Sequence, residues 1–531
     1  MSDRRKNRSG RPAPAGGARP SSPSQAVSSE RPDSGDVYTV TVTDLNNLGF
    51  GVGRLPGADG VPGTGLVVFV RGAVTGDVIQ TALIKRTSSY AIGRILRVVT
   101  PSPLRAEEAF CQAPEACGGC VFRHLAYEAE LDSKHHRVEA AFRQAGLPDV
   151  TVLPVLTGSA TFGYRNKGMY PVQNGKRGME AGFYAAKSHT LIPSAACSLQ
   201  PPVFAKLVQA VCAFCDGHHI PAYNERTGQG VLRHIYLRSS AGASERQGQI
   251  MVCLVIRTTT LPGGDSTTRA LVDTLRSAFP SVVSIQLNIN PENTNVVLGD
   301  SFLPLFGPEY IEDTLCGRHF RISAGSFYQV NHDAAELLYR TAARMAGLTG
   351  KENLWDLYCG TGTIGLSMVG RIWDGEQEIP GAATVTGVEI VPEAVACAKQ
   401  NADINAALGL IPPGVANFFC ADAGDPASLL SPMDGDFREG KGNGYNNDRL
   451  PHPDVVVIDP PRKGTTPALI HELARRNIGS VVYISCDPET LARDCAIFRS
   501  CGYAIGQAQP VDLFPRTGHV ECVVLLSRNE D

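Results

Sequence analysis

The chain has 531 residues, a length that is typical of two to four domains. Its net charge of −3 at pH 7 gives no global excess of basic residues, so any surface that binds nucleic acid must be local. No apolar run reaches the roughly 18 residues of a membrane-spanning helix, and we expect a cytoplasmic monomer that binds no membrane. Most of the 15 cysteines lie in apolar segments, which in a reducing cytosol indicates thiols or metal ligands rather than disulfides.

The first hundred residues have two parts. Residues 1–36 are rich in Arg, Ser, Pro, Gly and Ala and cannot bury enough apolar surface to fold. Such a basic tail either helps to hold RNA or only increases solubility. Residues 37–100 contain short apolar segments separated by glycine turns, such as GFGVGRL and GLVVFVRG. This pattern predicts a small closed barrel like the OB fold, and such barrels often bind single-stranded nucleic acid.

Residues 101–315 are expected to form a central domain of mixed α+β structure. The pattern predicts a long amphipathic helix over roughly Leu125–Ala145, followed by segments that combine basic and aromatic residues, such as YRNKGMYPV and LRHIYLR. The basic side chains of this region either contact phosphate groups or face water at strand edges: Arg165, Lys167, Lys187, Arg233 and Arg238.

Residues 316–531 alternate apolar strands with amphipathic helices. This alternation predicts a doubly wound, Rossmann-like α/β sheet. The expected strands are NLWDLYC, TVTGVEI, NFFCADA, DVVVIDPP, SVVYISCD and HVECVVLL. Two polar, glycine-rich stretches, about Arg371–Ala383 and Ser431–Pro453, are expected to be loops.

A nucleotide site is expected where the first of these strands ends. The segment DLYCGTGTIG (Asp356–Gly365) places glycines directly after the strand, which lets the backbone approach a ligand closely. Glu389 ends the next strand, where a carboxylate can bind ribose hydroxyls, and Asp422 follows the third. Acidic residues after three successive strands are typical of S-adenosylmethionine enzymes, whereas the glycine spacing satisfies the nicotinamide pattern only formally.

A reactive thiol is predicted at Cys486, which ends a strand directly before the helix that begins at Asp487-Pro488. A helix N-terminus favours the thiolate, so we expect a pKa below the ordinary value of about 8.5. Addition of this thiolate to carbon 6 of uracil would make carbon 5 nucleophilic enough to accept a methyl group. The carbon-5 proton must then leave, and Glu521, at the head of a later strand, is the candidate base. Asp459 and the two prolines that follow it would line the pocket.

Other methylase classes fit less well. An N6-adenine or amide methylase typically has Asn-Pro-Pro-Tyr where this chain has DPPR, and it needs no thiol. A cytosine-C5 enzyme would usually show Pro-Cys, which is absent.

These segments, together with AGSFYQVN (Ala324–Asn331), ISCDP and GHVE, resemble the RNA uracil-C5-methyltransferase family over roughly residues 37–528. The resemblance implies that the barrel is a TRAM domain and that the methyl donor is S-adenosylmethionine. It assigns Cys486 as the nucleophile and Glu521 as the base. It also implies that four residues contact the methyl donor: Gln329, Tyr358, Glu389 and Asp459.

Four cysteines resemble the cluster-binding residues of the rRNA-modifying branch of that family: Cys111, Cys117, Cys120 and Cys197. The resemblance implies a structural [4Fe-4S] cluster, although four thiolates with this spacing would equally suit zinc. The tRNA-modifying branch typically lacks both the cluster and the TRAM domain, so 23S rRNA is favoured over tRNA as the substrate. A non-catalytic RNA-binding factor is a further alternative, and the intact set of Gln329, Cys486 and Glu521 argues against it.

Overall fold

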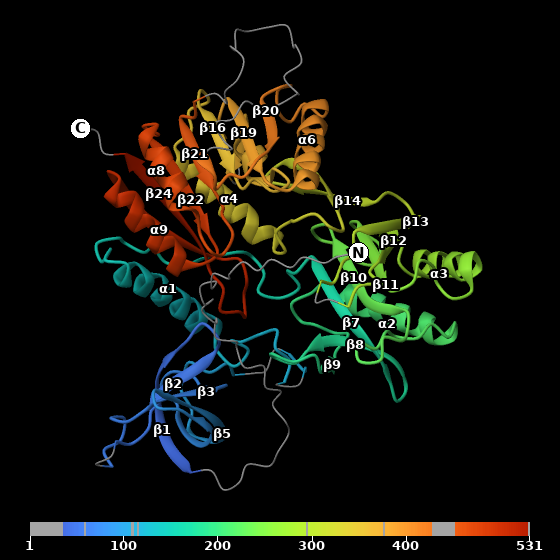
Figure 1. Cartoon of the computed structure of the whole chain (residues 1–531), viewed down its shortest axis with the longest axis horizontal. Helices are drawn as coiled ribbons and strands as arrows, with labels where there is room; N and C mark the ends of the chain where they lie inside the picture. The colour runs from blue at the N-terminus through green and yellow to red at the C-terminus, as the bar shows by residue number, and fades with distance from the viewer. Residues whose placement is uncertain are drawn as a thin grey trace, which may run out of the picture. The chain divides into compact units, whose positions relative to one another are not determined.

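The computed structural model describes residues 36–57, 60–107, 111–113, 116–293, 296–374, 377–426 and 452–528 (Figure 1). The predicted basic tail, apart from residue 36, and nearly all of the loop Ser431–Pro453 lie outside these ranges. None of the helices found within them is both long and apolar enough to cross a membrane.

The N-terminal strands close into a barrel in the order β1-β2-β3-β5-β4, as the sequence predicts. Alternate valines, such as Val40, Val42 and Val68, fill its interior. Glycine is required at Gly93, where a Cβ would lie 2.2 Å from the Thr81 hydroxyl oxygen. The strands are β1 (Val37–Leu45), β2 (Phe50–Arg54), β3 (Val67–Arg71), β4 (Val78–Arg86) and β5 (Tyr90–Thr100).

The central region is built on a mixed sheet in the order β13-β12-β11-β10-β7-β8-β9. Strands β10 and β11 are buried along their whole length because both of their faces are covered. This accounts for the continuous apolar sequence of β11, whereas β10 also buries Arg233, His234 and Arg238. The elements are β7 (Lys167–Gly175), β8 (Gly178–Tyr184), β9 (Leu191–Pro193), α2 (Pro202–Gly217), β10 (Leu232–Ser239), β11 (Ile250–Ile256), α3 (Gly264–Ala278), β12 (Val282–Ile289) and β13 (Ser301–Phe306).

The C-terminal sheet has the order β20-β19-β16-β21-β22-β24-β23-β6. The run from β20 to β22 is parallel, and β24 pairs antiparallel with β22. The strands are β6 (Leu156–Thr157), β16 (Asn353–Leu357), β19 (Thr384–Glu389), β20 (Ala416–Cys420), β21 (Val455–Ile458), β22 (Ser480–Ser485), β23 (Tyr503–Asp512) and β24 (Glu521–Arg528). The helices are α1 (Tyr127–Gln144), α4 (His332–Ala346), α5 (Thr363–Met368), α6 (Pro392–Ala407), α8 (Pro467–Arg475) and α9 (Pro488–Ser500).

Both faces of this sheet are covered, so its central strands are apolar throughout. In β21, Val455 and Val457 join a core that includes residues of α4, whereas Val456 and Ile458 join a core with α8, α9 and α1. Figure 1 shows α8 and α9 together on one side of the sheet. The α/β architecture expected from the sequence is therefore present, with helices on both faces.

Some elements differ from the expectation. The stretch Arg371–Ala383 was expected to be a loop, but it contains a short hairpin of β17 (Arg371–Asp374) and β18 (Gln377–Pro380). A second hairpin, β14 (Tyr310–Leu315) and β15 (Arg318–Ser323), precedes α4. The helix predicted at Leu125–Ala145 is present as α1, and both α1 and β6 pack with the C-terminal sheet. The domain limits taken from the sequence remain predictions.

Candidate active site

The predicted reactive groups gather at one edge of the C-terminal sheet because of strand direction. Glu389 ends β19, Asp459 follows β21 and Cys486 follows β22, and these strands run parallel. Strand β24 runs the opposite way, with Cys522 opposite Ser485, so its first residue, Glu521, lies beside the end of β22. The thiol and the carboxylate, 35 residues apart in sequence, therefore meet at the edge where ligands bind in open α/β sheets.

Cys486 does not have the low pKa that its place before a helix suggested. Burial, reinforced by the charges of Glu521 and Asp459, raises the pKa of its thiol to about 11, and the nearby Arg462 opposes the rise. The expectation of a thiolate was wrong for the protein without ligands. The N-terminus of α9 is already capped by Asp487, whose carboxylate accepts a hydrogen bond from the Thr490 amide at 3.0 Å.

Two carboxyl groups near this thiol have raised pKa values. Glu521 is 5% exposed, and burial and the charge of Asp459 raise its pKa to about 8, with Arg462 again opposing. Burial likewise raises the pKa of Asp459 to about 7. A group with a pKa of about 8 is mainly protonated at pH 7, so Glu521 must first lose its own proton before it can accept another as a base.

A buried network on α9 fixes the loop that carries Asp459. Asp494 has no exposed surface, and one of its oxygens accepts hydrogen bonds from the Tyr483 hydroxyl at 2.6 Å and the Thr465 amide at 2.9 Å. The hydroxyl of Thr465 lies 3.0 Å from that of Tyr358. Asp494 could not be recognised from the sequence, because a single aspartate inside a helix usually faces water.

The glycine-rich turn after β16 is held by the carboxylates predicted around it. Glu389 accepts a hydrogen bond from the Gly360 amide at 3.1 Å, and Asp356 accepts one from the Gly365 amide at 2.8 Å. Tyr358 adopts the left-handed conformation, with φ of 65°, which a non-glycine residue rarely does outside functional turns. A Cβ at Gly360 would meet nothing within 4 Å, so the turn leaves open space beside the backbone.

The same turn fits a positively charged ligand. Among the described residues, the second carboxylate oxygen of Asp356 is buried without a hydrogen-bond partner. Burial, together with the charges of Asp459 and Glu389, raises the pKa of Asp356 to about 7. A cation, such as the sulfonium of S-adenosylmethionine, would stabilise the charge of the buried Asp356, whereas an anionic pyrophosphate would not.

Gln329 lies in a segment that the central sheet holds against the turn. The backbone carbonyl of Gln329 accepts a hydrogen bond from the Asn166 side chain at 2.9 Å, and that of Phe327 accepts one from the Thr361 hydroxyl at 3.3 Å. Arg238, on β10, donates to the carbonyls of Ser323 at 2.6 Å and Ser326 at 2.9 Å. The central region thus positions one wall of the site.

This use of Arg238 corrects one of the sequence-based expectations. Arg238 and Arg233 are only 1% and 4% exposed, so they neither contact phosphate groups nor face water at strand edges. Arg233 donates from one nitrogen to the carbonyls of Asn290 at 2.8 Å and Glu292 at 2.5 Å. Both guanidinium groups fix backbone carbonyls instead.

Positive charge does collect beside the thiol, around His519. Burial and the charges of Arg462, Arg137, Lys134 and Arg165 lower the pKa of His519 to about 4. A guanidinium nitrogen of Arg462 lies 3.4 Å from the His519 ring. Lys134 already pairs with Glu130 and Asp512, and Arg137 pairs with Glu489. Arg462 and Arg165 are therefore the cations of this group that suit an anion such as a nucleotide phosphate.

The four predicted cysteine ligands lie in two segments, and all are half-buried; Cys111, Cys117 and Cys197 are near enough to Cys120 for their charges to affect it. Burial, followed by the neighbouring Cys197, Cys111 and Cys117, raises the pKa of Cys120 to about 12. Arg123 donates to the carbonyls of Cys111 and Ala113, each at 2.8 Å. A group of four thiols next to a cation suits a metal ion or cluster that would hold them as thiolates.

The comparisons with known proteins agree on an RNA-modifying enzyme. Residues 446–529 match the family described as tRNA (Uracil-5-)-methyltransferase, and residues 33–96 match the TRAM domain. An uncharacterized RNA methyltransferase of Bacillus cereus (strain ATCC 10987 / NRS 248) is 37% identical over 493 residues, which cover 92% of this chain and 96% of the relative. The uncharacterized RNA methyltransferase BH0687 of Halalkalibacterium halodurans is 36% identical over 492 residues, covering 92% of this chain and 97% of the relative.

A solved structure extends the likeness to the fold of almost the whole chain. The tRNA (uracil-54, C5)-methyltransferase of Pyrococcus abyssi, in complex with S-adenosyl-L-homocysteine, superposes with a TM-score of 0.66 at 24% identity. The match covers 92% of this chain and 100% of that one.

Proposed function

This chain belongs to the RNA uracil-5-methyltransferase family with a TRAM domain, and we propose that it methylates carbon 5 of a uridine through a covalent adduct with Cys486. It is an RNA methyltransferase that uses S-adenosylmethionine. The observation that carries the proposal is that the Cys486 thiol and the buried Glu521 lie at the end of β22, close enough for the charge of Glu521 to raise the pKa of the thiol.

In the proposed reaction, the Cys486 thiol first releases its proton to solvent. The thiolate sulfur then forms a bond to carbon 6 of the uracil, and the electron pair of the 5,6 double bond moves onto the ring as an enolate. S-adenosylmethionine supplies the electrophilic methyl group that carbon 5 accepts. Glu521 then takes the proton from carbon 5, the double bond reforms, and the sulfur leaves carbon 6 as a thiolate. Arg462 stabilises the negative sulfur at the start and at the end of this sequence.

The raised pKa of Cys486 sets a condition on this chemistry. A thiol with a pKa of about 11 is protonated at pH 7, so the nucleophile must form only when substrates are bound. A cationic methyl donor near Asp459 and Asp356 would offset their charge and favour the thiolate. We propose that Gln329, Tyr358, Glu389 and Asp459 contact this donor.

For the four-cysteine site we propose a [4Fe-4S] cluster with a structural role, and zinc is the alternative. Cys111, Cys117, Cys120 and Cys197 would be its ligands. The cluster would tie Cys197, on the segment before α2, to the segment between the barrel and α1, and Arg123 would offset part of its negative charge.

As the substrate we propose 23S rRNA, with tRNA as the second candidate. The tRNA enzyme of Pyrococcus abyssi matches 92% of this chain in fold, which keeps tRNA in consideration even with the barrel present. In vitro methylation of protein-free 23S rRNA, 16S rRNA and tRNA transcripts, with the modified base mapped by mass spectrometry, separates the two. A 5-methyluridine confined to tRNA would overturn the rRNA assignment and leave the chemistry intact.

A further inference from the structure

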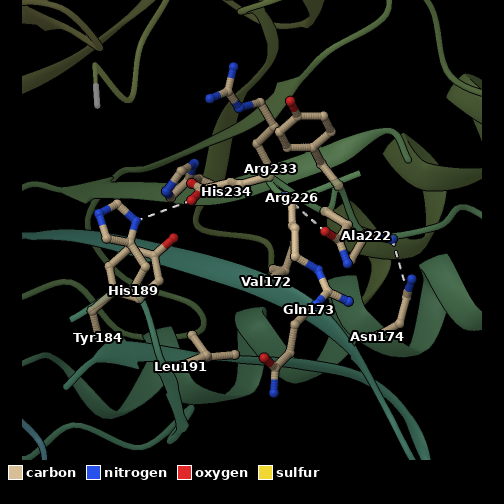
Figure 2. Close-up of a pocket in the computed structure, with 13 residues that line it drawn as sticks. Val172, Gln173, Asn174, Tyr184, His189, Leu191, Ala222, Arg226, Arg233 and His234 are labelled. Atoms are coloured by element: carbon tan, nitrogen blue, oxygen red, sulfur yellow. Dashed lines mark hydrogen bonds and ion pairs between the residues drawn. The ribbon is translucent and has the colours of Figure 1, made fainter. Parts of the chain in front are cut away.

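The central sheet carries a pocket of about 410 Å³ that lies apart from the residues of the candidate active site (Figure 2). Strands β7, β8, β9 and β10 and the segment Ala222–Arg226 line it. Its volume is within the range of sites for small organic molecules. The lining is mainly polar and aromatic, so a ligand would be bound by hydrogen bonds and ring contacts.

One side of the pocket offers an unused hydrogen-bonding group. His234 is 7% exposed, and among the described residues its ring nitrogen Nδ1 is buried without a partner. Burial and the adjacent Arg233 lower the pKa of His234 to about 4, so the ring is neutral at pH 7 and pairs one donor with one acceptor. Figure 2 shows His234 near His189, with Asn174 on the opposite side.

The pocket also has rigid aromatic surfaces. The Tyr223 ring lies 4.9 Å from the guanidinium of Arg233, which is itself fixed by two backbone carbonyls. The rings of Tyr184 and His189 pack with centroids 5.3 Å apart, and His189 pairs with Glu225 at 3.1 Å. Rings held in this way lose little entropy when a flat ligand stacks on them.

A basic turn adjoins the pocket. A second hollow, lined by Lys176 and Arg177 of the β7–β8 turn, shares Gln173 and Asn174 with the first. Both basic side chains are exposed. A phosphate group at this turn would let the attached base enter the pocket.

We propose that this pocket binds one unpaired nucleobase of the RNA substrate, with the adjoining phosphate at Lys176 and Arg177. Proteins recognise unpaired RNA bases by stacking and by hydrogen bonds to their edges, and these are the groups that the pocket presents. The inference rests on the proposed action on RNA, and it extends that proposal from the target base to a second, distant base.

Strand β7 connects the two sites. Asn166, just before β7, contacts the Gln329 segment, and Gln173 lies seven residues further along. At about 3.3 Å per residue this is roughly 23 Å, a span that several nucleotides can cover. A base bound at that distance would help to select one uridine among many, which a pocket for a single flipped base cannot do.

The test compares three full-length variants, Tyr184→Leu, His234→Gln and the double variant Lys176→Ala with Arg177→Ala, against a control. The control, Arg246→Ala with Arg269→Ala, removes two exposed charges of the same region outside the pocket. We expect about tenfold weaker binding of the cognate full-length RNA for the three variants, a size typical of one lost base contact. Methylation of an oligonucleotide of about five residues around the target uridine should stay at the wild-type rate. Equal losses on both substrates, or losses matched by the control, would overturn the proposal.

Two further measurements make the test independent of methyl transfer. Ultraviolet crosslinking of the wild-type protein to the RNA should label the peptides that contain Tyr184 or Tyr223, whereas labels confined to other segments would overturn the proposal. Binding of free AMP, GMP, CMP and UMP should be no tighter than millimolar. If a mononucleotide binds with a micromolar dissociation constant and does not compete with RNA binding, the ligand of the pocket is a free nucleotide, and the proposal of an RNA base is rejected. If RNA crosslinks to the pocket but the protein methylates no RNA, the proposed function is contradicted, whereas the proposal of a base-binding pocket stands.

Discussion

The two thiol sites of this molecule, Cys486 and the four-cysteine site, are both half-buried. Burial is the main cause that raises the pKa of Cys486 and of Cys120, and different neighbouring charges add to it. At Cys486 the opposing charges come from the carboxylates of Glu521 and Asp459. At Cys120 they come from the other three thiols. At Cys486, ligands that bind and leave during a reaction can offset the carboxylate charges and favour the thiolate. At the four-cysteine site, only a group that binds all the thiols together can do so. The difference suggests a reactive site and a structural site.

The largest effect is expected from Cys486→Ser, which should lower methyl transfer by more than about a thousandfold, because no bond to carbon 6 can form. Binding of S-adenosylmethionine, measured by calorimetry, should be unchanged. Cys501→Ser is a matched control, since Cys501 is also half-buried and lies at the other end of the same helix. Activity near that of the wild type in Cys486→Ser would contradict the covalent mechanism.

Glu521→Gln should let methyl transfer proceed but slow the release of RNA by roughly a hundredfold or more, a typical contribution of a general base. The protein–RNA adduct should then accumulate as a slow band on a denaturing gel with labelled RNA. The double variant with Cys486→Ser should show no band. Normal turnover, or the lack of an adduct in the single variant, would assign the base to another group.

The four-cysteine site is tested by metal content. Protein purified without oxygen should be brown and contain about four irons per chain. Cys197→Ser should lose most of this iron, while the exposed Cys420→Ser should keep it. One equivalent of zinc without iron would contradict the iron–sulfur cluster, although the four cysteines would remain the ligands.

Arg462→Ala should slow adduct formation by about tenfold at pH 7, because Arg462 is the cation that lowers the pKa of Cys486. Raising the pH should recover part of the rate, since more thiolate then forms. The neighbouring exposed Lys463→Ala controls for the loss of a positive charge. A loss that does not depend on pH would show that Arg462 acts on another step.

A smaller effect concerns stability. The native state holds a proton on Glu521 up to a pKa of about 8, whereas the unfolded chain releases it near 4.5. Stability from this group is therefore complete below pH 4.5 and falls as the pH rises through 8. Glu521→Gln should raise the free energy of unfolding more at pH 9 than at pH 5, by up to about 4 kcal/mol at about 1.4 kcal/mol per pKa unit. The exposed Glu393→Gln is the control, and an equal shift at both pH values would contradict the raised pKa.

The sequence predicted the parts of this site that depend on local pattern. Apolar strands followed by acidic residues or a cysteine located the positions of Glu389, Asp459 and Cys486, and short apolar segments separated by glycine turns predicted the barrel. It could not predict the pKa of Cys486, because Glu521 and Asp459 approach it only through the strand order. It also misjudged Arg233 and Arg238, since a basic residue in a strand looks the same whether it faces water or a buried carbonyl. The short hairpin of β17 and β18 has too few residues to show alternation.

The most direct test of the account uses RNA in which 5-fluorouridine replaces uridine. Fluorine at carbon 5 cannot leave as a proton, so Glu521 cannot complete the reaction and the sulfur–carbon bond should persist. With S-adenosylmethionine present, we predict a stable protein–RNA adduct, and mass spectrometry of its peptides should place one methylated fluorouridine on Cys486. An adduct on a different residue, or methylated RNA that is released without any adduct, would contradict the central claim.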